Sequence, residues 1–223
     1  MSQELQVYQA RLDISPIEVD RLWRFLSEDE RSRANQFKRA HLKRNFVAAR
    51  GNLRELLARW LDCEPQEIRF SYSDRGKPYL QNFSPSEEIY FNLAHSQDLA
   101  LYALSRHSAV GIDLEYINPN CDVMGIAGRY FLPAEQKIIS ELGDLQQQQL
   151  AFYQLWTLKE AYGKATGQGI ANLLDAIDVS LLLESPIGEI LQIEGWNLNI
   201  LNTDELAIAP SYAAALCKQA NRE

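Results

Sequence analysis

The chain has 223 residues, 46% of them hydrophobic, and a formal net charge of −8 at pH 7, so it is long enough to bury one large core or two small ones. The negative charge argues against a general nucleic-acid binder, because such proteins neutralise phosphates with Lys and Arg. No apolar run reaches membrane-spanning length, the N-terminal residues lack a signal-peptide pattern, and the three cysteines are far apart. We therefore expect a cytoplasmic protein with no membrane partner, disulfide framework or zinc site.

Hydrophobic periodicity and turn residues predict the elements of the first half. Ser15 is placed to cap the first helix, and residues 27–61 contain no proline and one glycine. We expect a strand over 5–14, a helix over 16–26, helical structure over 27–61, a strand over 68–72, a turn over 74–78, and a hairpin with strands over 89–94 and 99–104.

The second half repeats this order. We expect a strand over 110–116, helices over 129–142 and 146–166, a strand over 176–183, and strand-like segments over 190–193, 196–201 and 211–218. Short strings recur between the halves, as in 53–55 (LRE) and 158–160 (LKE), or 99–105 (LALYALS) and 211–217 (SYAAALC). Chance similarity between amphipathic elements would also give such matches. Their common order favours an α+β pseudodimer of two similar halves, residues 1–108 and 109–223, with the active site in the cleft between them.

Basic residues are concentrated in one segment. Between Arg31 and Arg59 there are nine Lys or Arg residues and one acid, Glu55, which leaves 13 basic and 29 acidic residues in the rest of the chain. A basic segment on an acidic body predicts a local anion site, although a solvated helix face would have a similar composition.

Two carboxylates are predicted to share one face of the strand over 110–116. Side chains alternate along a strand, so Asp113 and Glu115 would lie on the face opposite Ile112 and Leu114, with Gly111 leaving space beside them. Neighbouring carboxylates repel unless a cation or proton lies between them, and oxygen ligands suit Mg²⁺. A solvated acidic strand face is the alternative.

A later helix carries a second charged pair. Glu160 and Lys164 are four residues apart and therefore on one helix face. An ordinary surface pair would explain this spacing, but the flanking residues Phe152, Trp156 and Tyr162 are unusually aromatic for an exposed face. The pattern favours a functional carboxylate and ammonium at the edge of an apolar surface.

Four motifs in this order resemble the Sfp-type 4′-phosphopantetheinyl transferases. They follow the basic segment and are Gly76-Lys77-Pro78, Phe91-Asn92-Leu93-Ala94-His95-Ser96, Gly111-Ile112-Asp113-Leu114-Glu115, and Trp156-Thr157-Leu158-Lys159-Glu160-Ala161-Tyr162-Gly163-Lys164. The resemblance covers nearly the whole chain. It implies a pseudodimer that binds coenzyme A between its halves, in agreement with the internal repeat.

The resemblance also implies roles for individual residues. Asp113, Glu115 and Glu160 would bind Mg²⁺, and Lys164 would contact the phosphates. The coenzyme A site would comprise Arg33, Arg44, Arg50, Lys77, Pro78, Ala94, His95 and Lys164. Lys77 and His95 would hold the 3′-phosphate and adenine end, although a turn and a structural histidine would explain the same residues. Ala94 stands where the family usually has serine, so only its backbone N–H remains for a phosphate.

The implied reaction moves phosphopantetheine from coenzyme A to a serine of an apo acyl or peptidyl carrier protein and releases adenosine 3′,5′-bisphosphate. Glu160, directly or through a metal-bound water, is the candidate base, Lys164 would stabilise the leaving group, and Asp113 completes the catalytic set. Two other hypotheses are a Mg²⁺-dependent nucleotide phosphohydrolase and a non-catalytic coenzyme A binding module. The built-in pseudodimer favours a monomer.

Overall fold

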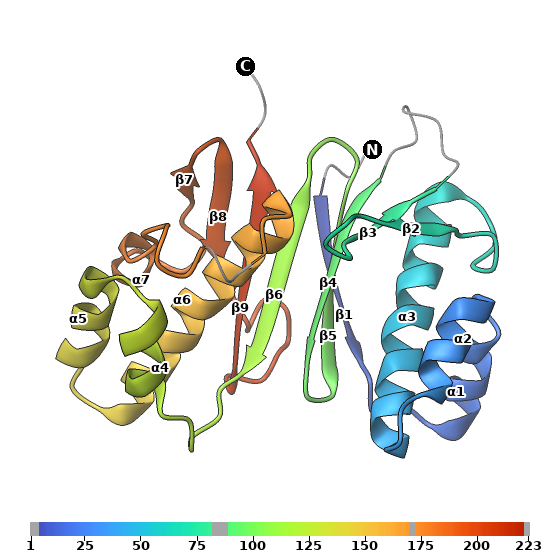
Figure 1. Ribbon diagram of the computed structural model, residues 1–223, viewed down its shortest axis with the longest axis horizontal. Helices are drawn as coiled ribbons and strands as arrows, with labels where there is room; N and C mark the ends of the chain where they lie inside the picture. Colours follow the sequence, from blue (N-terminus) through green and yellow to red (C-terminus); the bar gives the residue numbers. More distant parts are fainter. Residues whose placement is uncertain (1–4, 82–88, 170–172, 221–223) are drawn as a thin grey trace.

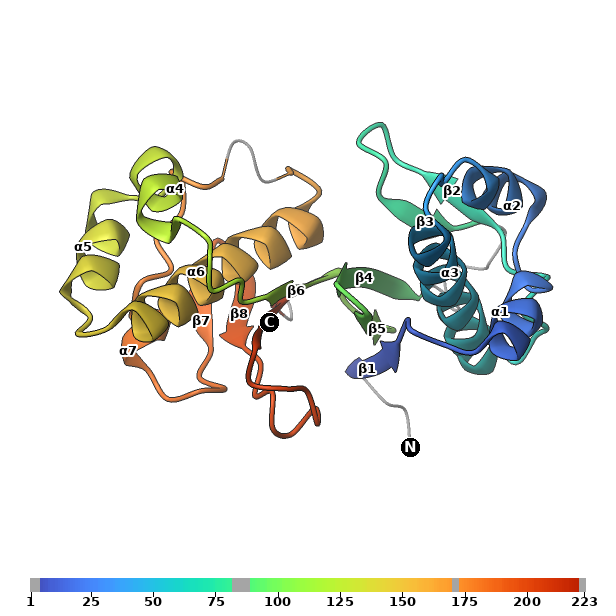
Figure 2. The same ribbon diagram turned by 90° about the horizontal axis from the view of Figure 1, so that it is seen from below.

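The computed structural model describes residues 5–81, 89–169 and 173–220. They form two halves side by side, each with a β-sheet whose outer face is covered by helices (Figure 1 and Figure 2). None of the helices in the described part of the chain is long and apolar enough to cross a membrane.

The N-terminal half contains a three-stranded antiparallel sheet in the order β1-β5-β4 and a separate β2–β3 hairpin. The long helix α3 packs behind the sheet, and Leu53 and Leu57 on its inner face belong to the same core as Phe91 and Tyr102 of the sheet. The elements are β1 (Leu5–Arg11), α1 (Pro16–Trp23), α2 (Glu28–Asn35), α3 (Ala40–Leu61), β2 (Phe70–Tyr72), β3 (Pro78–Leu80), β4 (Tyr90–Ser96) and β5 (Leu99–Ser105).

The C-terminal half contains a four-stranded antiparallel sheet in the order β6-β9-β8-β7. Helix α6 packs on its outer face, where Leu158 and Tyr162 share a core with Leu198 and Ala215. The elements are β6 (Val110–Tyr116), α4 (Val123–Tyr130), α5 (Pro133–Glu141), α6 (Leu145–Thr166), α7 (Leu181–Glu184), β7 (Leu191–Ile193), β8 (Trp196–Ile200) and β9 (Tyr212–Gln219).

The two halves share one topology. In each, the first strand pairs with the last long strand, β1 with β5 and β6 with β9, and the next strand in the sheet is β4 or β8. Helices α3 and α6 are both 22 residues long and begin 105 residues apart, at Ala40 and Leu145. The predicted α+β fold of two similar halves is confirmed.

Strands β4 and β6 join the halves. Their inner faces belong to a third apolar cluster, in which Ala94, Leu101 and Ala103 of the first half meet Ile112 and Leu114 of the second. Two polar side chains of β4 also bond to the backbone of β6. Asn92 Oδ1 accepts the Ile112 N–H at 2.9 Å and Ser96 Oγ accepts the Tyr116 N–H at 3.0 Å. Because the residue numbers in both pairs differ by 20, β4 and β6 run in the same direction.

The capping and alternation patterns of the sequence predicted several elements correctly. Ser15 Oγ accepts the Glu18 N–H at 3.3 Å, which confirms the predicted cap. The hairpin over 89–104 and the strand over 110–116 are present as β4, β5 and β6. Gly111, Asp113 and Glu115 lie on the face of β6 opposite Ile112 and Leu114, as alternation predicts.

Two predictions about elements are wrong, and a third is refined. The helical structure predicted over 27–61 is present as two helices, α2 and α3, with a break at 36–39 where the rings of Phe37 and Phe46 lie 5.5 Å apart. Residues 129–142 are divided between α4 and α5, since Pro133 lacks a backbone N–H and begins a new helix. The predicted strand over 176–183 is a loop followed by α7. The backbone of this loop forms hydrogen bonds with a buried ion pair and not with a neighbouring strand. Ile177 O accepts from Lys159, and the Val179 N–H donates to Glu135.

Candidate active site

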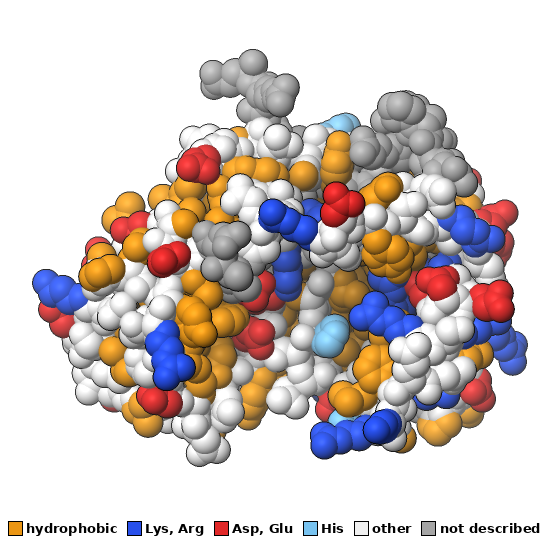
Figure 3. All heavy atoms as spheres, viewed as in Figure 1, with side chains coloured by type: hydrophobic (Ala, Val, Ile, Leu, Met, Phe, Trp, Pro, Cys, Tyr) orange, Lys and Arg blue, Asp and Glu red, His pale blue; other side chains and the backbone are white. Residues whose placement is uncertain are grey.

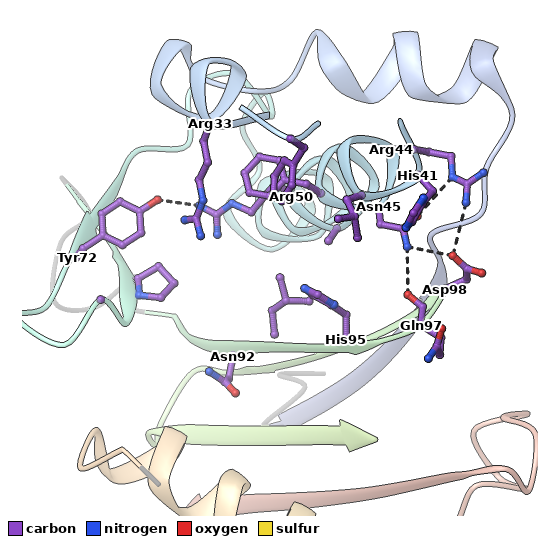
Figure 4. Close-up of a pocket in the computed structure, with 17 residues that line it drawn as sticks. Arg33, His41, Arg44, Asn45, Arg50, Tyr72, Asn92, His95, Gln97 and Asp98 are labelled. Atoms are coloured by element: carbon purple, nitrogen blue, oxygen red, sulfur yellow. Dashed lines mark hydrogen bonds and ion pairs between the residues drawn. The ribbon is translucent and has the colours of Figure 1, made fainter. Parts of the chain in front are cut away.

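A pocket of about 660 Å³ lies on the N-terminal half, between α2 and α3 on one side and β4 and the β2–β3 turn on the other (Figure 4). Polar and basic side chains point into it from both sides. The residues that line it include Arg33, His41, Arg44, Asn45, Arg50, Tyr72, Gly76, Pro78, Asn92, His95 and Asp98. Figure 3 shows basic side chains gathered on the N-terminal side of the central hollow, with acidic ones on the opposite rim.

The arginines of the pocket differ in their partners. Arg50 is held by Glu30, with Nε at 2.8 Å from Oε1, and donates to the Tyr72 hydroxyl. Arg44 Nη1 lies 2.6 Å from Asp13 Oδ1. Arg33 is exposed and stacks over the ring of Phe46. The charge of Arg33 is therefore the least compensated of the three.

The other predicted coenzyme-site residues divide into two groups. Pro78 and His95 line the pocket, and His95 extends from β4 toward α3. Partial burial lowers the pKa of His95, and the charge of Lys164 lowers it further. Ala94 faces the apolar contact between the halves, and Lys77 is directed away from the pocket toward the end of α6. The structure thus brings Arg33, Arg44, Arg50, Pro78 and His95 together at one pocket, but not Lys77 or Ala94.

The carboxylates of β6 lie beside this pocket. Asp113 is 3% exposed, and its Oδ1 lies 2.5 Å from the Lys164 ammonium. Glu115 accepts a hydrogen bond from the Ser96 hydroxyl at 3.0 Å. Burial raises the pKa of both carboxyls, and the charge of Asp113 raises that of Glu115 further. Lys164 opposes both shifts.

Helix α6 brings Glu160 and Lys164 to the same place. Burial and then the charge of Asp113 raise the pKa of Glu160, and Glu160 in turn raises that of Glu115. The three carboxylates of Asp113, Glu115 and Glu160 therefore lie within electrostatic reach of one another. Lys164 supplies the cationic side chain that contacts this acidic cluster, through its hydrogen bond to Asp113.

One observation tests whether a metal ion fits this acidic cluster. Asp113 Oδ2 is buried and has no hydrogen-bond partner, and an unpartnered buried carboxylate oxygen is costly unless a cation compensates it. Oxygen-only donors are those that Mg²⁺ prefers. The donor set therefore fits Mg²⁺. Within the described ranges, however, no three Asp, Glu, His or Cys side chains are already arranged around a metal position, so the side chains would have to close on the ion.

Gly111 brings β6 into close contact with α6, and Gly163 lies at a second close contact of the same helix. A Cβ on Gly111 would lie 2.1 Å from the Ala161 carbonyl oxygen and 2.4 Å from the Ala165 nitrogen. The space beside Asp113 is therefore filled by the helix backbone, and not left open for a ligand as the sequence suggested. Gly163 is in tight contact with the chain at Leu173 and Gly169, which explains a glycine inside this helix.

Three further residues shape the site, and the sequence motifs predicted no role for them. Ser96 binds both Glu115 and the backbone of β6, and Asn92 binds the same strand. Tyr72 extends over the pocket and bonds to Arg50. Positions 92, 94 and 96 alternate onto the face of β4 that meets β6. Strand periodicity therefore carried a signal for Asn92 and Ser96. The position of Tyr72 depends on a long-range contact and has no local signal.

Comparison with known families identifies the fold that holds this site. Residues 109–217 match the model of the 4′-phosphopantetheinyl transferase superfamily, and residues 14–107 match that of the 4′-phosphopantetheinyl transferase N-terminal domain. The chain belongs to the 4′-phosphopantetheinyl transferases. It is therefore an enzyme of a family that uses coenzyme A to modify carrier proteins.

Individual transferases match over much of the chain. The 4′-phosphopantetheinyl transferase HetI of Nostoc sp. (strain PCC 7120) is 39% identical over 209 residues, which cover 94% of this chain and 87% of that protein. A putative 4′-phosphopantetheinyl transferase of Synechocystis sp. is 40% identical over 152 residues, covering 68% of this chain and 61% of that protein. The transferase Sfp of Bacillus subtilis is 26% identical over 215 residues, covering 96% and 92%.

Proposed function

We propose that this transferase places the nucleotide end of coenzyme A in the pocket between α3 and β4, with its pyrophosphate directed toward Asp113, Glu115 and Glu160. Arg33, Arg44, Arg50 and His95 surround the pocket and offer positive charge or hydrogen bonds to phosphate. The acidic cluster is close enough for Lys164 to lower the pKa of His95 in the pocket. One bound coenzyme molecule would therefore extend from the basic residues to the carboxylates.

The carrying observation is the buried, unpartnered Oδ2 of Asp113 beside two other carboxylates of raised pKa. We assign Asp113, Glu115 and Glu160 as the Mg²⁺ ligands. When bound, the ion supplies a positive charge that offsets the pyrophosphate and the charge that develops on the leaving group. Because metal ligation requires ionised carboxylates, this site would be filled at neutral pH and lost in acid.

The chain's own residues would handle the proton and the leaving group. The hydroxyl oxygen of the carrier serine forms a bond to the phosphorus that bears pantetheine, and the P–O bond to the adenosine-linked phosphate breaks. Glu160 accepts the serine proton, directly or through a water molecule. Lys164, which is 2.5 Å from Asp113 in the free enzyme, pairs with the negative charge of departing adenosine 3′,5′-bisphosphate.

Intact mass spectrometry of a purified apo acyl carrier protein tests this function. Incubation with coenzyme A, Mg²⁺ and the enzyme should raise the carrier mass by about 340 Da, the mass of the added phosphopantetheine. A phosphohydrolase would instead cleave coenzyme A without a carrier, and a binding module would leave both unchanged. A peptide-synthase carrier domain run in parallel shows which class of carrier the enzyme serves.

Variants of the acidic cluster test the residue assignments. Asp113→Asn and Glu160→Gln keep the shape of each side chain but remove its charge, and we expect both to abolish transfer with the fold retained. Near-normal transfer by either variant would remove the metal assignment. Lys164→Ala should lower kcat by about 100- to 1,000-fold, as expected for lost charge stabilisation, and change the Kd for coenzyme A much less. The reverse pattern would make Lys164 a binding residue.

A further inference from the structure

Two cations of the N-terminal half are bound to the end of the helix that carries Glu160 and Lys164. Lys77 Nζ donates to the carbonyl oxygens of Lys164 at 2.5 Å and Ala165 at 3.1 Å. Arg75, two residues earlier in the same turn, donates to the carbonyls of Gly167, at 3.1 Å, and Gln168. We name Arg75 and Lys77 together the basic cap of α6.

Helix geometry gives the basic cap a clear electrostatic role. The last carbonyls of an α-helix have no partner within the helix, and they form the negative end of its dipole. Cations at this end are therefore favourable, and here they come from the opposite half of the molecule. Lys77 is partly buried, and burial lowers its pKa. The carbonyl oxygens that accept its hydrogen bonds favour its charged form in place of solvent.

Lys77 also contacts the strand that bears the other carboxylates. Its ammonium lies 3.4 Å from the carbonyl oxygen of Val110, the first residue of β6. The same ammonium thus binds both β6, which carries Asp113 and Glu115, and α6, which carries Glu160 and Lys164. Gly111 brings the two elements to backbone contact at this point. The relative position of the two elements at this end of the site is therefore set around Lys77.

The basic cap is continuous with the coenzyme pocket. Gly76 and Pro78, the residues on either side of Lys77, both line that pocket, as does Tyr72 from the adjoining strand. The turn over 73–78 is closed by hydrogen bonds between Ser73 and both Gly76 and Lys77. One face of this turn therefore lines the pocket and the other holds α6.

We propose that Lys77, assisted by Arg75, is a positioning residue for the transfer reaction: it fixes the C-terminal turn of α6 so that Glu160 and Lys164 meet Asp113 and Glu115. This inference rests on the proposed roles of those four residues. It assigns Lys77 to catalytic geometry through the peptide backbone, in place of direct contact with the 3′-phosphate of coenzyme A.

The test compares chemistry with binding in purified full-length variants. Lys77→Met keeps the length of the side chain and removes its charge. We expect it to lower kcat for transfer to the apo acyl carrier protein by about 10- to 100-fold, because displacements near 1 Å have effects of this size, while the Kd for coenzyme A from calorimetry changes less than about threefold. Arg75→Met, at an exposed position, should show the same pattern more weakly and serves if Lys77→Met does not fold.

Arg106→Met is the matched control. Arg106 donates to the carbonyl of Trp60 at 2.7 Å, in the last turn of α3, the helix equivalent to α6 in the first half. It should lower thermal stability by a similar amount without lowering kcat. A weaker Kd with kcat retained in Lys77→Met would make Lys77 a phosphate ligand and overturn the proposal, as would an equal loss of kcat in Arg106→Met. Full activity of Asp113→Asn would overturn the metal assignment instead, so the two failures can be told apart.

Discussion

At the scale of single residues, the site depends on ionisable groups whose charges are partly buried. Asp113 has one oxygen on Lys164 and one without a partner, and Glu115 and Glu160 have raised pKa values beside it. Desolvation also disfavours the charged form of His95, which for a base lowers the pKa, and the charge of Lys164 lowers it further. In the free protein, the ionised forms of these carboxyls and the cationic form of His95 are therefore all disfavoured.

The lowered pKa of His95 predicts a pH-dependent affinity for coenzyme A. A bound phosphate would raise this pKa, so binding should take up a proton and the Kd should fall as pH decreases from about 8 to about 6. In the free protein the sign is different: the cost of charging His95 is absent above its ordinary pKa, and stability is lost as pH falls toward the lowered one. Calorimetry and thermal unfolding of wild type against His95→Gln measure both effects. Identical pH profiles in the two proteins would contradict this assignment.

At the scale of elements, the close packing of β6 against α6 sets the distance between the two groups of carboxylates. Gly111 permits this packing, because any Cβ there would meet helix backbone and not a flexible side chain. A buried ion pair also fixes α6, next to Glu160. Lys159 Nζ lies 2.9 Å from Glu135 Oε1 and donates to the carbonyls of Leu174 and Ile177. Both contacts hold α6 from outside the pocket.

Gly111→Ala should lower the free energy of unfolding by about 3 kcal/mol, because overpacking against backbone is relieved only by moving the helix. Urea unfolding followed by circular dichroism measures this loss. Gly128→Ala is the matched control, since nothing lies within 4 Å of a Cβ at that exposed position in α4. It should raise stability by about 0.5–1 kcal/mol, the usual gain of alanine over glycine in a helix. Equal effects of the two substitutions would refute the packing argument.

Lys159→Met should lower the free energy of unfolding by about 3–5 kcal/mol, because it leaves Glu135 buried without its cation. Lys137→Met provides the comparison on a neighbouring helix. Lys137 lies 3.7 Å from Glu141 with both side chains more than half exposed, and its loss should cost less than about 0.5 kcal/mol. Chemical denaturation measures both losses, and an equally small loss in the two variants would contradict the importance of the buried pair.

At the scale of the whole molecule, the two halves share a core and therefore depend on each other. The apolar cluster between the sheets draws side chains from β4 and β5 as well as β6 and β9. Asn92 and Ser96 add hydrogen bonds across the same contact. Neither sheet has its own inner face covered without the other half. We expect the family's two-part architecture to unfold here as one cooperative unit.

The four tryptophans make this expectation measurable. Trp23 and Trp60 belong to the N-terminal core, and Trp156 and Trp196 pack on the C-terminal core. Two double Trp→Phe variants, each retaining one pair, should give coincident urea transitions by fluorescence, and circular dichroism should follow both. Separate midpoints for the two pairs would show that the halves unfold independently.

The sequence by itself determined the local elements and the chemical types in the site. Alternation placed Asp113 and Glu115 on one face of β6, helical spacing placed Glu160 beside Lys164, and a repeated order of elements indicated two similar α+β halves. These features depend on residues close together in the chain, so short periodic patterns contain them. The motifs that resemble the transferase family lie on the same local elements.

Only the tertiary structure decided the partners of the charged residues. It pairs Lys164 with Asp113, turns Lys77 onto the end of α6, and neutralises Glu30 with Arg50 and Arg54. It also replaces the predicted strand over 176–183 by a loop bound to Lys159. Such contacts join residues far apart in the chain, and their strength depends on burial and on distances that packing sets. No local pattern contains that information.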